Sequence, residues 1–370
     1  MKISIITFHN TSNFGATLQC VAFSKYLESL GHEVVIVNYL PEYVRNKISS
    51  KKELKNISKS KNKIKAIIKG LAYFSYSHKI NRRNKCFDSF ISENLNLSIE
   101  YNSYEELANN SPKADIYICG SDQIWNPSLT GNVFDKAFFL QYADGSKNAY
   151  GVSIGELNVS TNAEELRKLV EGYRNISVRE KSVAPLLSSA INKPVDVVLD
   201  CTLLLNKSVY SDLEHSLSIF DEPYVLVYNV QNSNLAADLA KKISENKKLK
   251  IIDISPNPFF HIRGSKKHID IGPGEFLFLI HNASCVVTNS FHGTVFSIIY
   301  EKEFYSFAHS KRSGRVKDLL ESLHLENRLI TDIDNFSETS IDYSAVNDEL
   351  SNYRKHSYNF INNIFNISGE

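Results

Sequence analysis

The chain has 370 residues, of which 42% are hydrophobic and 22% charged. This length exceeds what one compact core usually serves, so we expect two domains, and the composition excludes a disordered chain. The formal net charge of +1 hides an asymmetry, because residues 45–85 carry fourteen Lys or Arg and a single acid, Glu53.

The cysteines and the N-terminus indicate a cellular compartment. Five cysteines are scattered without a C-x-x-C pair, so neither a disulfide framework nor a zinc site is indicated, and a reducing cytoplasm fits. The N-terminus goes straight into a strand pattern, and no apolar run reaches the roughly 18 residues that span a bilayer. We therefore expect a cytoplasmic protein, neither secreted nor membrane-spanning, that could work at the inner face of the membrane.

Strand and helix patterns alternate along most of the chain, which favours parallel sheets covered by helices. The first half opens with the buried strand 3–8, the amphipathic helix 16–30 and the strand 34–38. After the basic stretch the sequence predicts, in order, the helix 104–109, the strands 116–119 and 149–153, the helix 163–173, and the strands 176–178 and 195–199.

The second half repeats this alternation after a linker at about residues 205–222. The predicted elements are the strand 224–230, the helix 234–246, the strand 250–254, the helix 274–282, the strand 285–288, the helix 293–300 and the strand 303–307. We therefore expect an N-terminal domain at 1–205, a C-terminal domain at 223–335 and a helical tail at 336–370. The tail helix, 345–367, could pack back over the first domain.

The basic stretch 45–85 contains apolar residues at roughly helical spacing among its lysines, namely Ile57, Ile64, Ile67, Ile68 and Leu71. Such a helix suits an anionic membrane surface or an anionic glycolipid. The alternative is a solvated, lysine-rich insertion. No recognition motif accompanies it, so we do not expect nucleic acid as a partner.

A polar loop at residues 7–16 leaves the first strand and enters a helix. Its glycine and small residues would let an anionic ligand approach the backbone N–H groups of the helix. The spacing is not G-x-G-x-x-G, so a dinucleotide fingerprint is absent. Asn13 either caps the helix or contacts the ligand.

A second candidate segment follows the strand 116–119 and contains Ser121, Asp122, Gln123 and the chain's single tryptophan, Trp125. A tryptophan near a carboxylate and an amide is a common way to stack a sugar ring and bond its hydroxyls. The alternative is a buried tryptophan that stabilises a long loop, with Asp122 in an Asx turn.

Arg179 stands just past another strand, beside Glu180. Its planar guanidinium binds carboxylate or phosphate with two hydrogen bonds, so it suits a small dianionic donor. The alternative is an Arg–Glu pair that fixes the start of a helix.

His292 lies in a Ser-Phe-His-Gly turn between an apolar strand and a helix. Open α/β folds place ligands at this rim of the sheet, so His292 is the first candidate for acid/base chemistry. The alternative is a structural histidine, buried in the core with its hydrogen bonds made. Downstream cations, namely Lys302, Lys311, Arg312 and Arg315, together suggest a pocket for phosphate or carboxylate.

These segments, in this order over roughly residues 1–330, resemble the polysaccharide pyruvyl transferase family. One departure is Cys201, where the family usually has proline. The blocks that carry the resemblance are Asn13-Phe14-Gly15-Ala16 with Gln19, Gly120-Ser121-Asp122-Gln123-Ile124-Trp125-Asn126, Ser177-Val178-Arg179-Glu180, Leu199-Asp200-Cys201-Thr202-Leu203-Leu204, Gly272-Pro273-Gly274-Glu275-Phe276 and Thr288-Asn289-Ser290-Phe291-His292-Gly293-Thr294.

The resemblance implies an α/β fold with two Rossmann-like domains facing a cleft, as in the B-type glycosyltransferases. It implies transfer of enolpyruvate from phosphoenolpyruvate to a sugar diol, forming a ketal on a bacterial capsule, an exopolysaccharide or its lipid-linked precursor. Phosphoenolpyruvate is then a substrate, and no cofactor or metal is expected.

The resemblance also suggests roles for the site residues. His292 would be the acid/base residue, and Asp122 would be a second base or, with Trp125, Gln123 and Ser121, an acceptor contact. The donor would be held by Arg179, Lys311, Arg315, Ser290 and Asn13.

The sequence leaves two other classes of protein function as alternatives. A nucleotide-sugar glycosyltransferase would share the architecture, but Glu275, Glu301 and Glu303 lack the seven-residue spacing that many such enzymes use. The other is a non-catalytic capsule-assembly protein; the presence of both Arg179 and His292 weighs against it.

Overall fold

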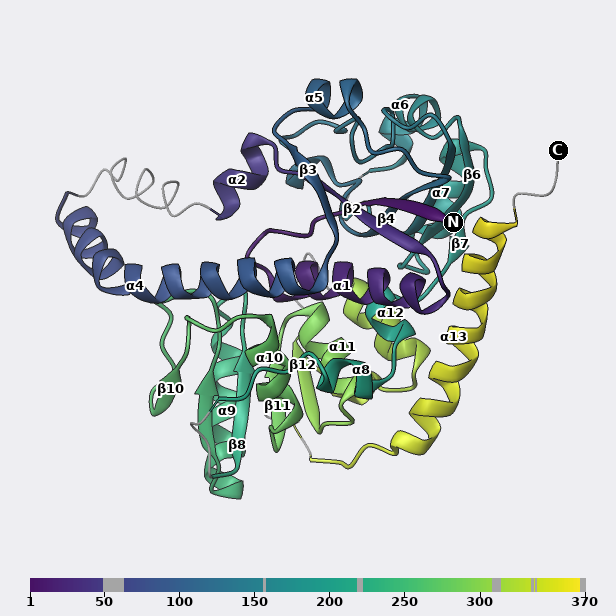
Figure 1. Ribbon diagram of the computed structural model, residues 1–370. Helices are drawn as coiled ribbons and strands as arrows, with labels where there is room; N and C mark the ends of the chain where they lie inside the picture. The colour runs from purple at the N-terminus through teal and green to yellow at the C-terminus, as the bar shows by residue number, and fades with distance from the viewer. Residues whose placement is uncertain are drawn as a thin grey trace.

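The computed structural model describes residues 1–48, 63–155, 158–217, 222–307, 314–333, 336 and 338–366. This part of the chain forms two separate sheets, one above the other in Figure 1, and all their strand pairings are parallel. Within it, no helix combines the length and the apolar composition needed to cross a bilayer.

The first sheet has seven strands in the order β3-β2-β1-β4-β5-β6-β7. The chain runs outward in opposite directions from β1 and β4, so the switch point at which open α/β sheets bind ligands lies between these two strands. The strands are β1 Lys2–Ile6, β2 Glu33–Tyr39, β3 Leu97–Tyr101, β4 Ile116–Asp122, β5 Ser146–Val152, β6 Tyr173–Val178 and β7 Asp196–Val197.

The second sheet has six strands in the order β10-β9-β8-β11-β12-β13, with its switch point between β8 and β11. Its strands are β8 Tyr224–Tyr228, β9 Lys250–Asp253, β10 Ser265–Lys267, β11 Cys285–Thr288, β12 Phe304–Phe307 and β13 Leu329–Ile330.

Helices join and cover the strands of both sheets. The α-helices are α1 Phe14–Ser29, α2 Glu42–Ile48, α4 Lys63–Asn94, α5 Tyr104–Asn109, α6 Ala163–Leu169, α7 Ala184–Ile191, α8 Lys207–Ser211, α9 Asn234–Lys247, α10 Pro273–His281, α11 Phe291–Ile299, α12 Gly314–Ser322 and α13 Tyr343–Phe365. Short 3-10 turns include η1 Pro127–Leu129, η2 Ser160–Asn162, η3 Cys201–Leu204 and η4 Glu326–Arg328.

The predicted class, two Rossmann-like α/β domains, is confirmed, and most predicted elements are present with ends shifted by a few residues. The sequence reading missed β3, β10 and β13, which are edge strands with few fully buried residues. It also missed α2, α7 and α12, and α8 forms within the segment 205–222 that was predicted to be the linker.

Helix α1 is buried on nearly all sides rather than amphipathic as the sequence predicts. All but one of its residues from Phe14 to Leu27 are buried, because the helix lies between the first sheet and the second domain. The Phe14 ring stacks on Phe276 of α10 at a centroid distance of 4.5 Å. One hydrophobic cluster therefore runs from β1 through α1 into α10, α11 and α13.

Helix α4 covers the second part of the basic stretch. It continues past Leu71, the last residue of the predicted helical pattern, to Asn94. It lies along the boundary between the domains in Figure 1. Arg82 donates to the carbonyl of Asp270 and to the Glu275 carboxylate, both in the second domain. The lysines on which the membrane prediction depends fall outside the described side chains, but this end of the basic stretch is an interdomain contact.

Helix α13 contacts both domains. The Tyr343 hydroxyl, near its start, donates to the carbonyl of Lys302 in the second domain. Further along, Tyr358 stacks on Tyr26 of α1 at 5.2 Å and donates to the carbonyl of Leu204. The predicted return of the C-terminal helix to the first domain is confirmed, and the helix also forms one side of the molecule in Figure 1.

Candidate functional site

The candidate site lies where the carboxyl ends of the two sheets meet. The first sheet contributes Asp122 at the end of β4, Arg179 directly after β6 and Asp200 shortly after β7. The second sheet contributes α11, which starts two residues after β11 and carries His292 in its first turn. Residues from both domains therefore converge at the edge where such folds bind ligands.

Asp200 is the centre of this cluster. Its Oδ2 accepts hydrogen bonds from the Arg179 guanidinium and, at 3.3 Å, from the Ser121 hydroxyl, while Oδ1 accepts from the Thr202 backbone N–H at 3.0 Å. Burial alone would raise the pKa of the Asp200 carboxyl, but Arg179 and His292 hold it well below its usual range. Asp200 is therefore a buried, ionised group.

The Arg179 guanidinium is buried, and carboxylates neutralise its charge. A second nitrogen, Nη2, lies 3.5 Å from Asp122 Oδ1. Burial opposes its charge, but Asp200 and Asp122 outweigh this and raise the pKa of the guanidinium. Its Nε is buried and has no hydrogen-bond partner in the described part of the chain.

His292 is 93% buried at the interface, with a relative exposure of 7%. Ser290 caps α11 by accepting from the Gly293 N–H, and this cap fixes the turn that carries the histidine. His292 Nε2 lies 3.7 Å from Asp200 Oδ2 and makes no hydrogen bond with the described residues. Nε2 is thus a buried ring nitrogen whose nearest charged neighbour is the Asp200 carboxylate.

Gly15 of α1 leaves the space that the His292 ring occupies. A Cβ atom at position 15 would lie 2.0 Å from His292 Nδ1, far inside contact distance. The glycine of the predicted Asn-Phe-Gly-Ala block is therefore needed for close approach of the two domains at the histidine.

Arg315 of α12 completes the cluster from the second domain. It stands 5.5 Å from the Phe291 ring centroid, on which Arg179 also packs at 5.3 Å. With its amide oriented to present oxygen, Gln123 accepts from Arg315 at 2.8 Å. Burial and the neighbouring Arg179 lower the pKa of the Arg315 guanidinium.

The structure thus brings together five predicted site residues, namely His292, Arg179, Asp122, Arg315 and Gln123. Asn13 serves as the N-cap of α1, which is one of its two predicted roles. The Ser121 hydroxyl turns inward to Asp200 and the residue is fully buried, so the predicted acceptor contact is wrong. Lys311 lies outside the described residues.

The predicted stacking of a sugar on Trp125 is also wrong. The indole is 1% exposed, stacks on Phe139 at 4.8 Å and donates its N–H to the carbonyl of Phe138 at 3.1 Å. Both its faces and its polar atom are used inside the first domain. The alternative reading, a buried tryptophan that stabilises a long loop, is the correct one.

Two buried charged groups were not singled out by the sequence analysis. Asp200 follows a strand, but it was noted only within a block that resembles the family. Arg83 of α4 packs over the Phe14 ring at 4.5 Å and donates to the Ser12 carbonyl at 3.0 Å. Burial lowers the pKa of its guanidinium.

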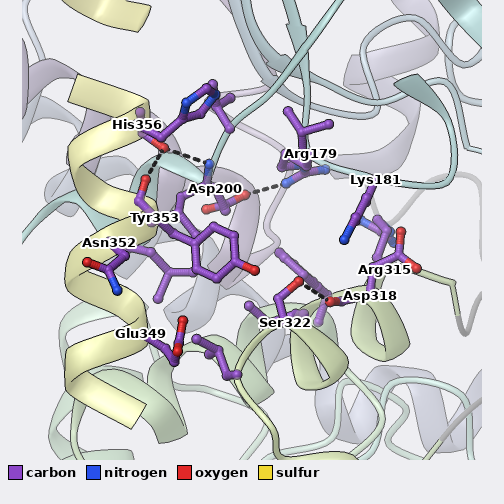
Figure 2. A pocket seen from close by; sticks show the side chains of 18 residues that line it. Arg179, Lys181, Asp200, Arg315, Asp318, Ser322, Glu349, Asn352, Tyr353 and His356 are labelled. Carbon is purple, nitrogen blue, oxygen red and sulfur yellow. Dashed lines mark hydrogen bonds and ion pairs between the residues drawn. The ribbon is translucent and has the colours of Figure 1, made fainter. Parts of the chain in front are cut away.

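A pocket of about 410 Å³ opens beside the cluster. Its lining includes Arg179, Asp200 and Phe291 together with residues of α12 and α13. Figure 2 shows the Tyr353 ring projecting from α13 into this space, and Glu349 and Asn352 of the same helix also line the pocket. In the described residues, no group of three or more His, Cys, Asp or Glu side chains is arranged to hold a metal ion.

Comparison with solved structures defines the class of fold. An α-glucosyltransferase in complex with UDP has a TM-score of 0.50 and 10% identity, with 97% of this chain and 95% of that chain covered. The UDP-GlcNAc 2-epimerase from Neisseria meningitidis gives a TM-score of 0.48 and 9% identity, with coverages of 97% and 93%. The chain has the two-domain B-type architecture of glycosyltransferases.

Comparison with protein families is more specific. Residues 13–311 match the polysaccharide pyruvyl transferase family, and the chain belongs to this family. The matched range contains all of the motifs that carry the resemblance, including the His292 turn and the Arg179 segment. A search of curated proteins gives no match.

Proposed function

We propose that the protein transfers the enolpyruvyl group of phosphoenolpyruvate to two neighbouring hydroxyls of a bacterial surface-glycan sugar, with formation of a pyruvate ketal. One observation carries the proposal. A buried histidine stands at the domain interface with its Nε2 3.7 Å from the ionised Asp200, which Arg179 holds in place. Family membership supplies the reaction class.

Ketal formation makes definite demands on a site. Carbon 3 of the donor gains a proton, carbon 2 becomes cationic, the first hydroxyl adds there, phosphate leaves and the second hydroxyl closes the ring. One hydroxyl proton ends on carbon 3 and the other leaves with the phosphate. His292 is the group that delivers and recovers these protons.

The surrounding charges suit a cationic carbon. Asp122, Asp200 and Glu180 lie among Arg179 and Arg315, and carboxylates at this position would stabilise positive charge that develops at carbon 2. Asp200 also orients the imidazole, since its Oδ2 faces Nε2. Binding the anionic donor here needs further cations, and the family resemblance assigns that role to Lys311 together with Arg315.

The acceptor is proposed to be a sugar or a lipid-linked oligosaccharide of a capsule or exopolysaccharide. A contact of the basic stretch 45–85 with an anionic membrane belongs to the same proposal, and it is supported by composition alone. No nucleic acid and no cofactor has a role in the scheme.

The test uses the purified full chain, phosphoenolpyruvate and the surface glycan of the source organism after mild acid has removed its pyruvate ketals. The wild type should release phosphate in step with pyruvate incorporation, and UDP-sugars should not replace the donor. His292→Asn should lower kcat about 100-fold to 10,000-fold, the usual contribution of a positioned acid/base group.

His261→Asn is the matched control, because this exposed histidine of the second domain is outside the cluster. Its kcat should equal that of the wild type. A His292→Asn enzyme with more than about a tenth of wild-type kcat would mean that the histidine only packs the interface.

A further inference from the structure

We propose that the pocket between α12, α13 and the β7 edge binds the acceptor sugar, with α13 supplying the hydroxyl-binding groups. This inference rests on the proposed function and deepens it. It moves the acceptor away from the tryptophan loop, whose Trp125 is closed off inside the first domain.

The first argument is continuity with the reacting groups. Asp200 and Arg179 are among the residues that line the pocket, and the Asp200 carboxylate lies 3.7 Å from His292 Nε2. His292 itself does not line the pocket, so a ligand that fills the pocket is separated from the histidine by Asp200. This position fits a substrate and is too close to the reaction centre for a remote effector.

The second argument is the distribution of charge across the pocket. Arg179, Lys181 and Arg315 line one side, whereas α13 presents Glu349, Asn352 and Tyr353 on the other. An anionic three-carbon donor would be attracted to the cations and repelled by Glu349 and by Asp318 of α12. A neutral sugar suits the α13 side, because carboxylate and amide groups bind hydroxyls.

The third argument is that these α13 groups are available. The side chains of Glu349, Asn352 and Tyr353 make no hydrogen bond or ion pair within the described part of the chain. Tyr353 is 37% exposed, and its ring projects from α13 into the pocket in Figure 2. Tyr353 offers an aromatic face and a polar hydroxyl, the features for which Trp125 was predicted to stack on a sugar.

The size of the pocket fits one hexose with room beside it. Small-molecule sites typically measure about 300–1,000 Å³, and this pocket, at about 410 Å³, is larger than a three-carbon phosphate requires. Leu319, Leu323 and Val197 add apolar surface for the carbon-bound face of a sugar ring. The pocket therefore matches an amphipathic, uncharged ligand.

The experiment measures donor and acceptor kinetics separately, with phosphoenolpyruvate and the depyruvylated surface glycan as the two substrates. Asn352→Ala and Tyr353→Ala should each raise the acceptor KM about fivefold to tenfold, as expected for losing one or two neutral hydrogen bonds or an aromatic contact. The donor KM should stay within about twofold of the wild type. Tyr353→Phe should have a smaller effect than Tyr353→Ala.

Asn359→Ala is the matched control. Asn359 is an exposed asparagine on the same helix, two turns after Asn352, and it does not line the pocket. Its acceptor KM should be unchanged. Equal acceptor KM values for the wild type, Asn352→Ala and Tyr353→Ala would overturn the inference, and so would a rise confined to the donor KM.

Failure of the proposed function gives a different result. A wild type that gains no thermal stability from phosphoenolpyruvate, or that binds it and transfers nothing to the glycan, contradicts the proposed reaction itself. If the wild type transfers pyruvate and the α13 variants keep the wild-type acceptor KM, only the proposed location of the acceptor is contradicted.

Discussion

At the scale of single residues, the site is a set of neighbouring charged groups that come from different strands and from both domains. His292 comes from the second domain, whereas Asp200 and Arg179 follow different strands of the first. Arg179 neutralises Asp200, and Asp200 in turn faces the imidazole. Because each member compensates or orients the next, removing one leaves a buried group without its partner.

Asp200→Asn tests this dependence. The substitution removes the carboxylate nearest to the buried Arg179 guanidinium and leaves Asp122 and Glu180, so the free energy of unfolding at pH 7 should fall by about 3 kcal/mol. Urea denaturation measures this loss. Asp196→Asn, at an exposed aspartate of β7, is the control and should change stability by less than about 0.5 kcal/mol.

The same variant has a defined pH dependence. The native pKa of Asp200 lies below its unfolded value of about 3.9, so the contribution of the carboxylate is complete above that value and is lost as pH falls toward the native pKa. The stability difference between wild type and Asp200→Asn should thus be constant from pH 7 to about 5 and shrink below about 4. A difference that grows on acidification would contradict the assignment of Asp200 as an ionised group.

At the scale of elements, the site depends on how closely α1 of the first domain approaches α11 of the second. Phe14 packs under this contact, and Gly15 gives the His292 ring its space. The backbone of Gly15 is not in the left-handed region, so alanine could adopt its conformation and would normally favour a helix. Any loss of activity on substitution of Gly15 by alanine therefore comes from the clash with His292.

Gly15→Ala should therefore lower kcat at least about tenfold by displacing the imidazole from Asp200, because misplacement of a reacting group by about 1 Å can cost 100-fold. Steady-state kinetics check this. Gly314→Ala, at the start of α12, is the matched control, since a Cβ there meets nothing within 4 Å. If both variants kept wild-type kcat, the geometry at His292 would not matter for turnover.

Elements also show what the sequence could and could not predict. Buried parallel strands such as β1, β4 and β11 read as continuous apolar runs, so their positions and the polar residues at their ends were predictable. Trp125 and Asp200 were not, since neither periodicity nor spacing tells whether a side chain turns inward. The pocket residue Tyr353 was not predictable as a site residue, because the pocket exists only after α13 meets both domains.

At the scale of the whole molecule, α4 joins the two domains through Arg82. Its guanidinium bonds Asp270 and Glu275, and Glu275 also accepts from the Gly272 N–H at the start of α10. Arg82 is partly exposed, whereas the Glu275 side chain is 7% exposed, so loss of the arginine would leave a nearly buried carboxylate with only its backbone partner.

Arg82→Gln should lower Tm by roughly 2 °C, the shift expected for about 1 kcal/mol in a chain of this size. Differential scanning fluorimetry measures it. Lys85→Gln, on the same helix and exposed, removes an equal charge and should leave Tm unchanged. Equal shifts in both variants would assign the effect to net charge rather than to the interdomain contact.

The continuous hydrophobic cluster that passes from β1 through α1 into α10, α11 and α13 determines what can fold alone. Each half of the chain uses the other half as part of its own core, so neither is an autonomous cooperative unit. A cut in the segment between the sheets would expose Phe14, Phe276 and their neighbours to water on both fragments, and such patches drive aggregation. The two halves of the reaction centre are thus made by a single folding event.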